Sequence, residues 1–341
     1  MSQTPILAVK GLVKRFQVGG GLFSRPAIVH AVENVAFSVP AQGSLGLVGE
    51  SGCGKSTVAR SLLRLIEPDA GEVVFEGVDL LGLSKPRMRS VRQHLQIIFQ
   101  DPYASLNPRR TVAQTLTEPL KVHGLQSSSE INARVAAALA EVGLPADSAR
   151  RYPHEFSGGQ RQRIGIARAL VLAPRFIVAD EPVSALDVSV QAQVLKLLDG
   201  LRARHGLSFL FVSHDLGVVR HICDRVAVMY LGRVIEEAPV PDIFDQPLHP
   251  YTQMLRAASP VPDPKARFAL PRIIGEIPSA VNLPSGCAFH PRCPDAMPRC
   301  SVEAPPMLEV APGRRVACHL HSASGPAENS RAGPISPRKK S

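Results

Sequence analysis

The chain has 341 residues, of which 45% are hydrophobic, so we expect one large domain with a smaller module beside it. No apolar run approaches the roughly 20 residues that span a bilayer, and Met1–Pro5 lacks a signal-peptide pattern, which predicts a cytoplasmic protein that meets a membrane only through partners. The formal net charge is +10, but the basic residues are scattered, Trp is absent and aromatics make up 5%, so nucleic-acid binding is not expected.

Short apolar runs alternate with helical patterns from about Ile6 to Arg256, which indicates an α/β domain with a largely parallel core sheet. Three glycines between two early strand-like runs, Gly19, Gly20 and Gly21, predict a hairpin tip. The expected core strands are Leu45–Val48, Phe176–Ala179, Phe209–Val212 and Val226–Met229.

The segment Gly49–Ser56 satisfies every fixed position of the pattern G-x-x-x-x-G-K-[ST]. It follows the strand-like run Ser44–Val48 and precedes a helical pattern over Thr57–Ile66, which counts Leu65 among its apolar positions. This order turns backbone N–H groups and a helix start onto a nucleoside triphosphate, and a chance glycine turn fits it poorly. The residues assigned to this site are Gly49, Glu50, Ser51, Gly52, Cys53, Gly54, Lys55, Ser56 and Thr57, with Lys55 on the β- and γ-phosphates and Ser56 on Mg²⁺.

Two carboxylates follow the apolar run Phe176–Ala179. Asp180 is expected to bind Mg²⁺ through water, and Glu181 to polarise the attacking water as general base. A strand that ends in two acidic residues is common, but downstream of a phosphate-binding loop it indicates a hydrolytic site.

A second anion site is predicted where the helical pattern Arg161–Leu170 begins. The four residues before it are Ser157, Gly158, Gly159 and Gln160, and they suggest that two chains share each nucleotide. Together these motifs resemble the ATP-binding subunits of ABC transporters, in which the signature of one subunit closes over the γ-phosphate held by the other. The resemblance implies an ABC-type P-loop fold, with a mostly parallel core sheet, an antiparallel β subdomain and a helical subdomain, and ATP with Mg²⁺ as cofactors.

Four further positions match motifs of that family. Gln100 corresponds to the Q-loop glutamine, which contacts Mg²⁺ or water and couples to the membrane subunits, and the segment from Gln100 to about Leu125 is expected to face them. Asp187 ends the D-loop, which lies across the dimer seam, and His214 is the switch histidine near the γ-phosphate. Phe16 stands in the place of the aromatic that stacks on adenine, although an aromatic in an edge strand usually serves packing.

The resemblance extends to the dipeptide/oligopeptide importer branch through residues 99–108, 152–160 and 180–187 and through His249-Pro250-Tyr251. The insertion near residue 20 and the sequence of residues Gly49–Gly54 are most similar to those of the second, F-type ATPase subunit of such importers. This implies ATP-driven peptide import at the cytoplasmic face of the bacterial inner membrane. The implied partners are a second ATPase subunit in a heterodimer, two membrane permeases and, indirectly, an external peptide-binding protein.

The expected organisation is an ATP-binding domain over 1–256, a C-terminal extension over 257–321 and a disordered tail over 322–341. A surface linker is predicted from its prolines, Pro260, Pro262, Pro264 and Pro271.

Four cysteines of the extension form a cluster with spacings x5, x6 and x17: Cys287, Cys293, Cys300 and Cys318. A cytoplasmic location argues against disulfides, and the spacings lack the C-x2-C pairs of zinc ribbons. The favoured interpretation is a [4Fe–4S] cluster, as in cluster-bearing modules that the extension resembles. Zinc, with His290, His319 or His321 as further ligands, and free thiols are the alternatives.

Three alternative functions remain beside peptide import. The same motor serves nickel or glutathione in related importers. An ABC ATPase that acts on DNA or ribosomes usually has long coiled coils or two cassettes in one chain, and neither is present. The third is an iron–sulfur redox or sensing protein that uses ATP.

Overall fold

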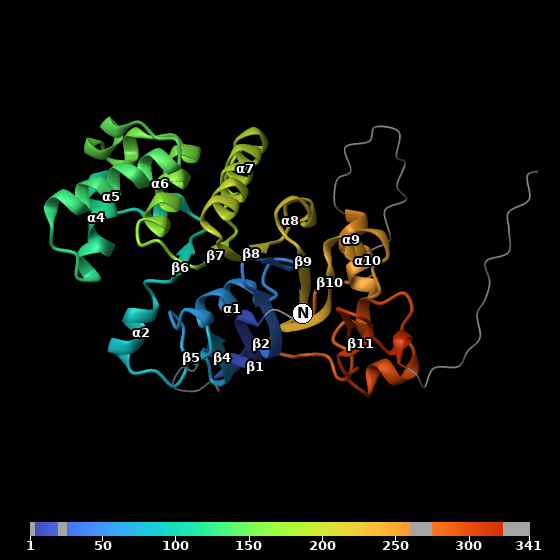
Figure 1. Ribbon diagram of the computed structural model, residues 1–341. Coiled ribbons are helices and arrows are strands. Elements are labelled where there is room, and N and C mark those ends of the chain that lie inside the picture. The colour runs from blue at the N-terminus through green and yellow to red at the C-terminus, as the bar shows by residue number, and fades with distance from the viewer. Residues whose placement is uncertain (1–3, 20–25, 259–274, 323–341) are drawn as a thin grey trace, which may run out of the picture.

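The computed structural model describes residues 4–19, 26–258 and 275–322. The predicted hairpin tip at Gly20 and Gly21, the proline-rich linker and the tail from 323 onward lie outside these residues. Within them, two sheets are packed with helices, and a separate group of helices stands at the upper left of Figure 1.

The central sheet has eight strands in the order β11-β12-β10-β9-β3-β8-β7-β6. Strands β6, β7, β8, β3 and β9 run parallel, whereas β10, β12 and β11 are antiparallel. The four expected core strands are confirmed. The bounds are β3 (Ser44–Val48), β6 (Leu95–Ile98), β7 (Phe176–Asp180), β8 (Ser208–Ser213), β9 (Arg225–Tyr230), β10 (Arg233–Pro239), β11 (Leu308–Ala311) and β12 (Arg314–Val316).

Strands β11 and β12 belong to the C-terminal extension, and β12 pairs with β10 of the core. The register places Val316 opposite Glu236, and Arg315 opposite Glu237. The sequence predicted a small module beside the core. In the structure, two strands of this extension, β11 and β12, lengthen the central sheet, on the right-hand side of Figure 1.

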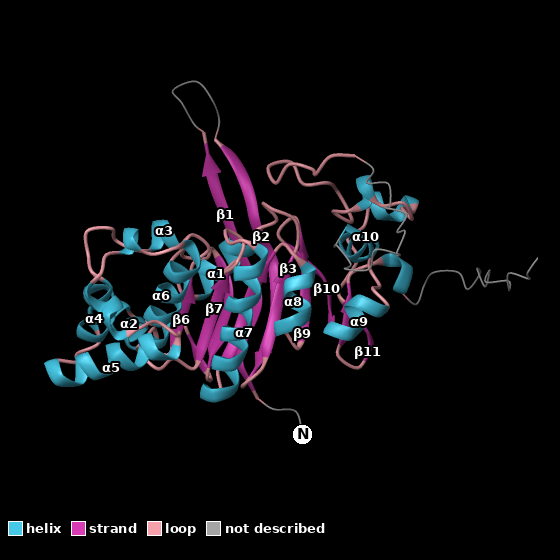
Figure 2. Ribbon diagram, turned by 90° about the horizontal axis from the view of Figure 1, so that it is seen from above, coloured by secondary structure: helices cyan, strands magenta, loops and turns pink. Residues whose placement is uncertain are grey.

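The smaller sheet is antiparallel, in the order β2-β1-β4-β5. Its long hairpin, β1 with β2, projects from the body in Figure 2. It supplies the antiparallel β subdomain that the family resemblance implied. The bounds are β1 (Pro5–Val18), β2 (Ala27–Pro40), β4 (Ala70–Phe75) and β5 (Val78–Asp79).

The helices fall into two groups. Helices α4, α5 and α6 pack together as the helical subdomain, and α1, α7 and α8 flank the central sheet. The bounds are α1 (Lys55–Leu62), α2 (Lys85–Val91), α3 (Pro102–Ser105), α4 (Val112–Val122), α5 (Ser128–Glu141), α6 (Gly158–Leu170), α7 (Val188–His205), α8 (Leu216–Ile222), α9 (Val240–Asp245) and α10 (Pro250–Ala258). No helix of the described chain has the length and apolar character that crossing a membrane requires.

The first helix is shorter than its sequence pattern. The apolar spacing predicted a helix as far as Ile66, but α1 ends at Leu62 and Leu65 is 48% exposed. The reason is local, since Arg64 adopts a left-handed conformation with φ of 50°, which a helix cannot contain.

Alternating side chains of the core strands enter two separate hydrophobic cores. In β7, Ile177 belongs to the core shared with α4–α8, whereas Val178 belongs to the core shared with α1 and the smaller sheet. Burial on both faces explains why these parallel strands read as continuous apolar runs. The ends of the same strands therefore stand at fixed positions, and these ends carry the candidate site.

Candidate nucleotide site

The phosphate-binding loop joins the buried strand β3 to α1. Two of its glycines lie against other backbone segments. A Cβ at Gly54 would lie 2.0 Å from the carbonyl oxygen of Ala31 in β2, and a Cβ at Gly49 would lie 2.2 Å from that of Met229 in β9. Only glycine permits this approach, so both strands hold the loop in one path.

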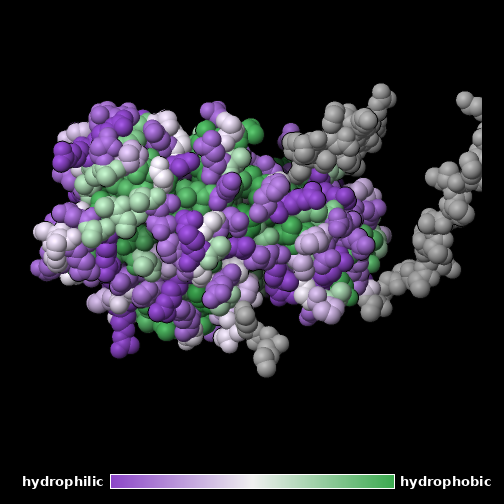
Figure 3. Space-filling model, turned by 45° about the horizontal axis from the view of Figure 1, so that its top comes forward, coloured by the Kyte–Doolittle hydropathy of each residue, from purple (hydrophilic) through white to green (hydrophobic). Residues whose placement is uncertain are grey.

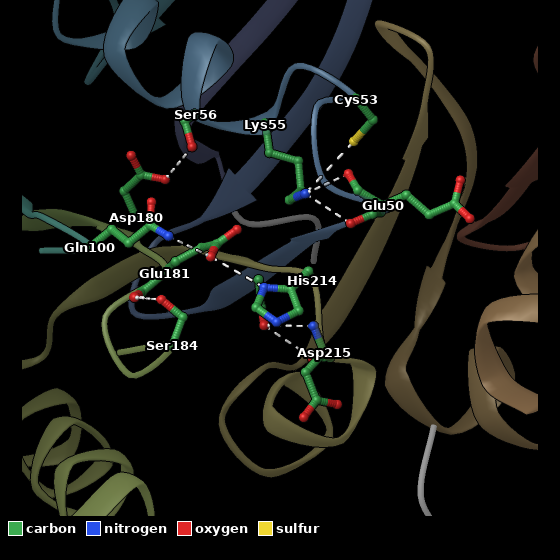
Figure 4. A network of polar contacts seen from close by, with 12 residues as sticks. Glu50, Cys53, Lys55, Ser56, Gln100, Asp180, Glu181, Ser184, His214 and Asp215 are labelled. Carbon is green, nitrogen blue, oxygen red and sulfur yellow. Dashed lines mark hydrogen bonds and ion pairs between the residues drawn. The ribbon is translucent and has the colours of Figure 1, made fainter. Parts of the chain in front are cut away.

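Lys55 is buried at the base of this loop, 4% exposed. Its Nζ donates hydrogen bonds to the carbonyl oxygens of Gly49 at 2.8 Å and Glu50 at 2.9 Å (Figure 4). Both acceptors are neutral, so the ammonium charge is not cancelled by them and remains to attract an anion. Cys53 lies beside it, with Sγ 3.8 Å from Nζ, and burial raises the pKa of the thiol.

Ser56 and Asp180 form the part of the site that suits a cation. The Ser56 hydroxyl donates to Asp180 Oδ1 at 2.8 Å. The other oxygen, Oδ2, is buried without a hydrogen-bond partner among the described residues, and Arg60 Nε is 3.9 Å away. Burial raises the pKa of Asp180. A buried carboxylate oxygen without a partner, next to a hydroxyl, fits the oxygen ligands that Mg²⁺ prefers.

Glu181 occupies the centre of a hydrogen-bonded line of side chains (Figure 4). Gln100 Nε2 donates to Glu181 Oε2 at 3.0 Å, and His214 Nδ1 lies 3.2 Å from the same oxygen. Glu181 also has a φ of 48°, an unusual conformation for a residue other than glycine. Its backbone N–H donates to Val212 at 3.0 Å, which helps to hold this conformation at the end of β7.

Lys55, Ser56, Gln100, Glu181 and His214 line one open pocket of about 750 Å³. Many positions expected from the sequence line it, together with residues of β1 and β2 and of the loops that follow β6, β7 and β8. The lining residues are Phe16, Val29, Ala31, Ser51, Gly52, Gly54, Lys55, Ser56, Thr57, Gln100, Glu181, Ser184, Ala185, His214 and Ala280. The roles assigned to them stay predictions.

The wall formed by Phe16, Val29, Ala31 and Ala280 includes three positions that the sequence reasoning missed. Val29 pairs directly with Phe16 across β1 and β2, so the hairpin pattern could have indicated it. Ala280 comes from the C-terminal extension, and its carbonyl oxygen accepts a hydrogen bond from the His30 N–H at 2.9 Å. No local sequence signal points to this contact.

The signature segment is not part of the pocket of its own chain. Ser157 caps α6, since its Oγ accepts from Gln160 N–H at 3.4 Å and its N–H donates to Gln160 Oε1 at 3.0 Å. Ser157 is exposed. A Cβ at Gly159 would lie 2.4 Å from Val190 Cγ1, so the start of α6 packs against the start of α7, directly after the exposed Asp187.

Comparisons with known proteins agree with this geometry. A family profile described as "ABC transporter" matches residues 32–184, and one described as "Oligopeptide/dipeptide transporter, C-terminal region" matches residues 235–300. The oligopeptide transport ATP-binding protein AppF of Bacillus subtilis is 51% identical over 325 residues, covering 94% of this chain and 99% of AppF. The chain belongs to the ABC transporter ATPases.

Further relatives of this ABC ATPase support the same assignment. A probable peptide ABC transporter ATP-binding protein of Sinorhizobium fredii, y4tS, is 52% identical over 324 residues, covering 94% of this chain and 92% of that protein. The dimeric post-hydrolysis structure of the ATP-binding cassette MJ0796 bound to ADP and Pi matches with a TM-score of 0.61 at 29% identity, over 69% of this chain and 98% of that one. The structure of cbiO1 from Clostridium perfringens matches with a TM-score of 0.61 at 26% identity, over 71% of this chain and 91% of that one.

The four clustered cysteines of the ABC ATPase lie close enough to influence one another, but not around a single ion. Within the described chain, no group of three His, Cys, Asp or Glu side chains is placed to hold a metal ion, so the metal prediction is not confirmed. Burial raises the pKa values of Cys293 and Cys318 to about 11, and the neighbouring thiols add to both shifts. The backbone groups of Asp295 and Leu320, two residues further along, act in the opposite direction on the two pKa values.

Proposed function

We propose that this ABC ATPase energises the import of dipeptides or oligopeptides, with ATP binding closing a dimer of ATPase subunits and hydrolysis reopening it. The observation that carries the proposal is the divided site. Residues of the P-loop line one pocket with Glu181 and His214, and Asp180 is hydrogen-bonded to Ser56 of that loop. The exposed signature residue Ser157 is not among the residues that line this pocket. The full-length similarity to oligopeptide transport proteins and the matching C-terminal region support peptides as the cargo.

Hydrolysis follows from the side chains around Glu181. The carboxylate accepts the proton of the attacking water, while Gln100 and His214 fix its Oε2 by hydrogen bonds. Lys55 and the loop N–H groups hold the phosphates, and Phe16 with its neighbours covers the base. Ser56 and Asp180 would hold Mg²⁺, which supplies positive charge to the phosphate oxygens when bound.

The proposed partners are a related ATPase subunit in a heterodimer and two permeases at the cytoplasmic face of the inner membrane. Support for the dimer comes from the exposed Ser157 and from Val188, which is 81% exposed after Asp187. Support for permease docking comes from apolar surface over the helical region, on the left of Figure 3, and from Tyr103, 62% exposed between Gln100 and Leu125.

We assign the cysteine cluster to a structural [4Fe–4S] centre held by Cys287, Cys293, Cys300 and Cys318. The four thiolates would hold such a centre, which would brace the extension when bound. Burial raises the pKa of the Cys287 thiol, and the backbone N–H groups of Phe289 and His290 act in the opposite direction. Binding of the cluster would therefore have to release the thiol protons.

Anaerobic purification tests the cluster. We expect roughly four irons per chain and broad absorption near about 400 nm. Replacing Cys300 by Ala should lower the iron content, whereas the control Cys223→Ala, in the buried core far from the extension in sequence, should keep it. Stoichiometric zinc without iron would favour a zinc site instead. A stable extension without any metal would show that the cysteines are free thiols.

Reconstitution with the permeases tests the cargo. Vesicles that contain the full complex and the binding protein should take up labelled di- or oligopeptide in an ATP-dependent way, and a complex with Glu181→Gln should not. Uptake of nickel or glutathione in place of peptide would assign the same motor to those cargoes. ATPase activity that responds to DNA or ribosomes but not to the permeases would contradict a transport role.

A further inference from the structure

Glu50, the second residue of the P-loop motif, is held at three points. Its backbone N–H donates to the Tyr251 hydroxyl at 2.9 Å, and its carbonyl oxygen accepts from Lys55 Nζ at 2.9 Å. Its carboxylate accepts from both terminal nitrogens of Arg292, at 2.8 and 3.0 Å. In Figure 4 this carboxylate points away from Glu181 and the phosphate side of the loop. The side chain therefore serves as an attachment point for the loop rather than as a nucleotide ligand.

Arg292 is built to make this attachment. Its side chain is 3% exposed, and the guanidinium lies 5.9 Å from the ring centroids of both Tyr230 and Phe289. Tyr251 packs on the same two rings, at 4.7 and 5.4 Å between centroids. A buried guanidinium with a two-point bond to a carboxylate has little freedom to move, so it transmits its own position to its partner.

The arginine comes from the C-terminal extension, 242 positions after Glu50. It directly precedes Cys293, and Phe289 follows Cys287 by two residues, so the thiol cluster flanks the segment that reaches the P-loop. The extension meets the nucleotide pocket a second time at Ala280, which lines the pocket and bonds to His30. One segment of the chain thus contacts both the phosphate loop and the opposite wall.

We propose that Arg292 is a positioning residue for the nucleotide, which fixes the P-loop through Glu50 so that the C-terminal extension sets the affinity for ATP. With the ion pair intact, Glu50 stays in a fixed position, so its carbonyl oxygen remains within hydrogen-bond distance of Lys55 Nζ. The backbone N–H groups that follow Glu50 in the loop keep their positions as well. Without the pair, the described contacts that remain at Glu50 are to its backbone, from Tyr251, Lys55 and the Cys53 N–H. Ordering the loop then becomes part of the cost of binding ATP. This inference concerns ATP binding alone and does not depend on the imported cargo.

The test compares Arg292→Gln, Glu50→Gln and the double variant in the full chain, by calorimetric titration with ATPγS and Mg²⁺ and by steady-state hydrolysis. We expect Kd and KM for ATP to rise on the order of tenfold in each single variant, as loss of a charged hydrogen-bonded pair predicts, with kcat at saturating ATP changed much less. The double variant should bind ATPγS no more weakly than the weaker-binding single variant, because both substitutions remove the same ion pair.

Arg225→Gln is the matched control. Arg225 also joins core and extension, through Glu237 at 3.1 Å and the Gly313 carbonyl at 2.7 Å, but it lies away from the P-loop. It should lower thermal stability as Arg292→Gln does and leave Kd for ATPγS unchanged. Equal Kd values for wild type and Arg292→Gln, or equal weakening by Arg225→Gln, would overturn the proposal. If Arg292→Gln does not fold, the Kd of Glu50→Gln for ATPγS tests the proposal by itself, since that variant changes no residue of the extension.

Discussion

His214 Nδ1 lies 3.2 Å from Glu181 Oε2, although 33 positions separate the two residues in the chain. Strands β7 and β8 are parallel neighbours, so the residues that follow them meet at one edge of the sheet. The same oxygen accepts a bond from Gln100, which follows β6 on the other side of β7. Residues that follow three adjacent strands thus fix one carboxylate in place.

Glu181→Gln should preserve ATP binding and lower turnover by about 100- to 10,000-fold, because the amide keeps the shape but cannot accept the proton of water. ATP-dependent dimers should then accumulate, which size-exclusion chromatography with ATP and Mg²⁺ measures. Glu76→Gln is the control, since Glu76 shares the same φ of 48° but lies in an exposed turn paired with Arg175. Turnover equal to wild type in Glu181→Gln would remove the role assigned to it.

Lys55→Ala should weaken ATP binding by tenfold or more, because it removes a buried positive charge beneath the phosphates. Binding of adenosine, which has no phosphate, should change little. Fluorescence titration with a labelled ATP analogue measures the difference, and Lys196→Ala, at an exposed position of α7, serves as the control. Loss of adenosine affinity of the same size would indicate a collapsed pocket instead of a lost phosphate contact.

Gly159→Ala should disturb the signature, because the added Cβ would lie 2.4 Å from Val190 Cγ1 and push α6 and α7 apart. We expect lower thermal stability and lower ATP hydrolysis, and Val190→Ala in the same chain should restore part of both. The control is Gly165→Ala in the same helix, where the added Cβ meets nothing within 4 Å. There the better helix propensity should stabilise the protein by about 0.5–1 kcal/mol. Equal behaviour of Gly159→Ala and Gly165→Ala would contradict the packing argument.

Contiguous patterns predicted most of the fold and the candidate site. The P-loop, Asp180 and the strand ends are local features, and the parallel sheet brings them together as expected. Contacts between distant segments could not be predicted, because no local pattern encodes them: Arg292 reaches Glu50, and Ala280 reaches His30. The end of α1 was also missed, since the left-handed turn at Arg64 leaves no mark in the apolar spacing.

His249 should make the protein less stable in acid. The ring is 1% exposed, its Nδ1 accepts the Tyr251 N–H at 3.0 Å, and burial, followed by the nearby His321, lowers its pKa to about 3. The unfolded chain binds a proton near pH 6.5 while the folded chain does not, so this residue lowers stability progressively as the pH falls from about 6.5 toward 3. The slope should reach about 1.4 kcal/mol per pH unit in that window.

His249→Asn isolates this contribution, because asparagine can accept the same N–H but does not titrate in this range. Urea unfolding at pH 7, 6 and 5 should show that wild type loses stability faster than the variant on acidification, with the two lines diverging below about pH 6.5. If the free energy of unfolding changed with pH equally in the two proteins, the His249 ring would take up a proton equally well in the folded and unfolded chain. Burial would then not control its charge.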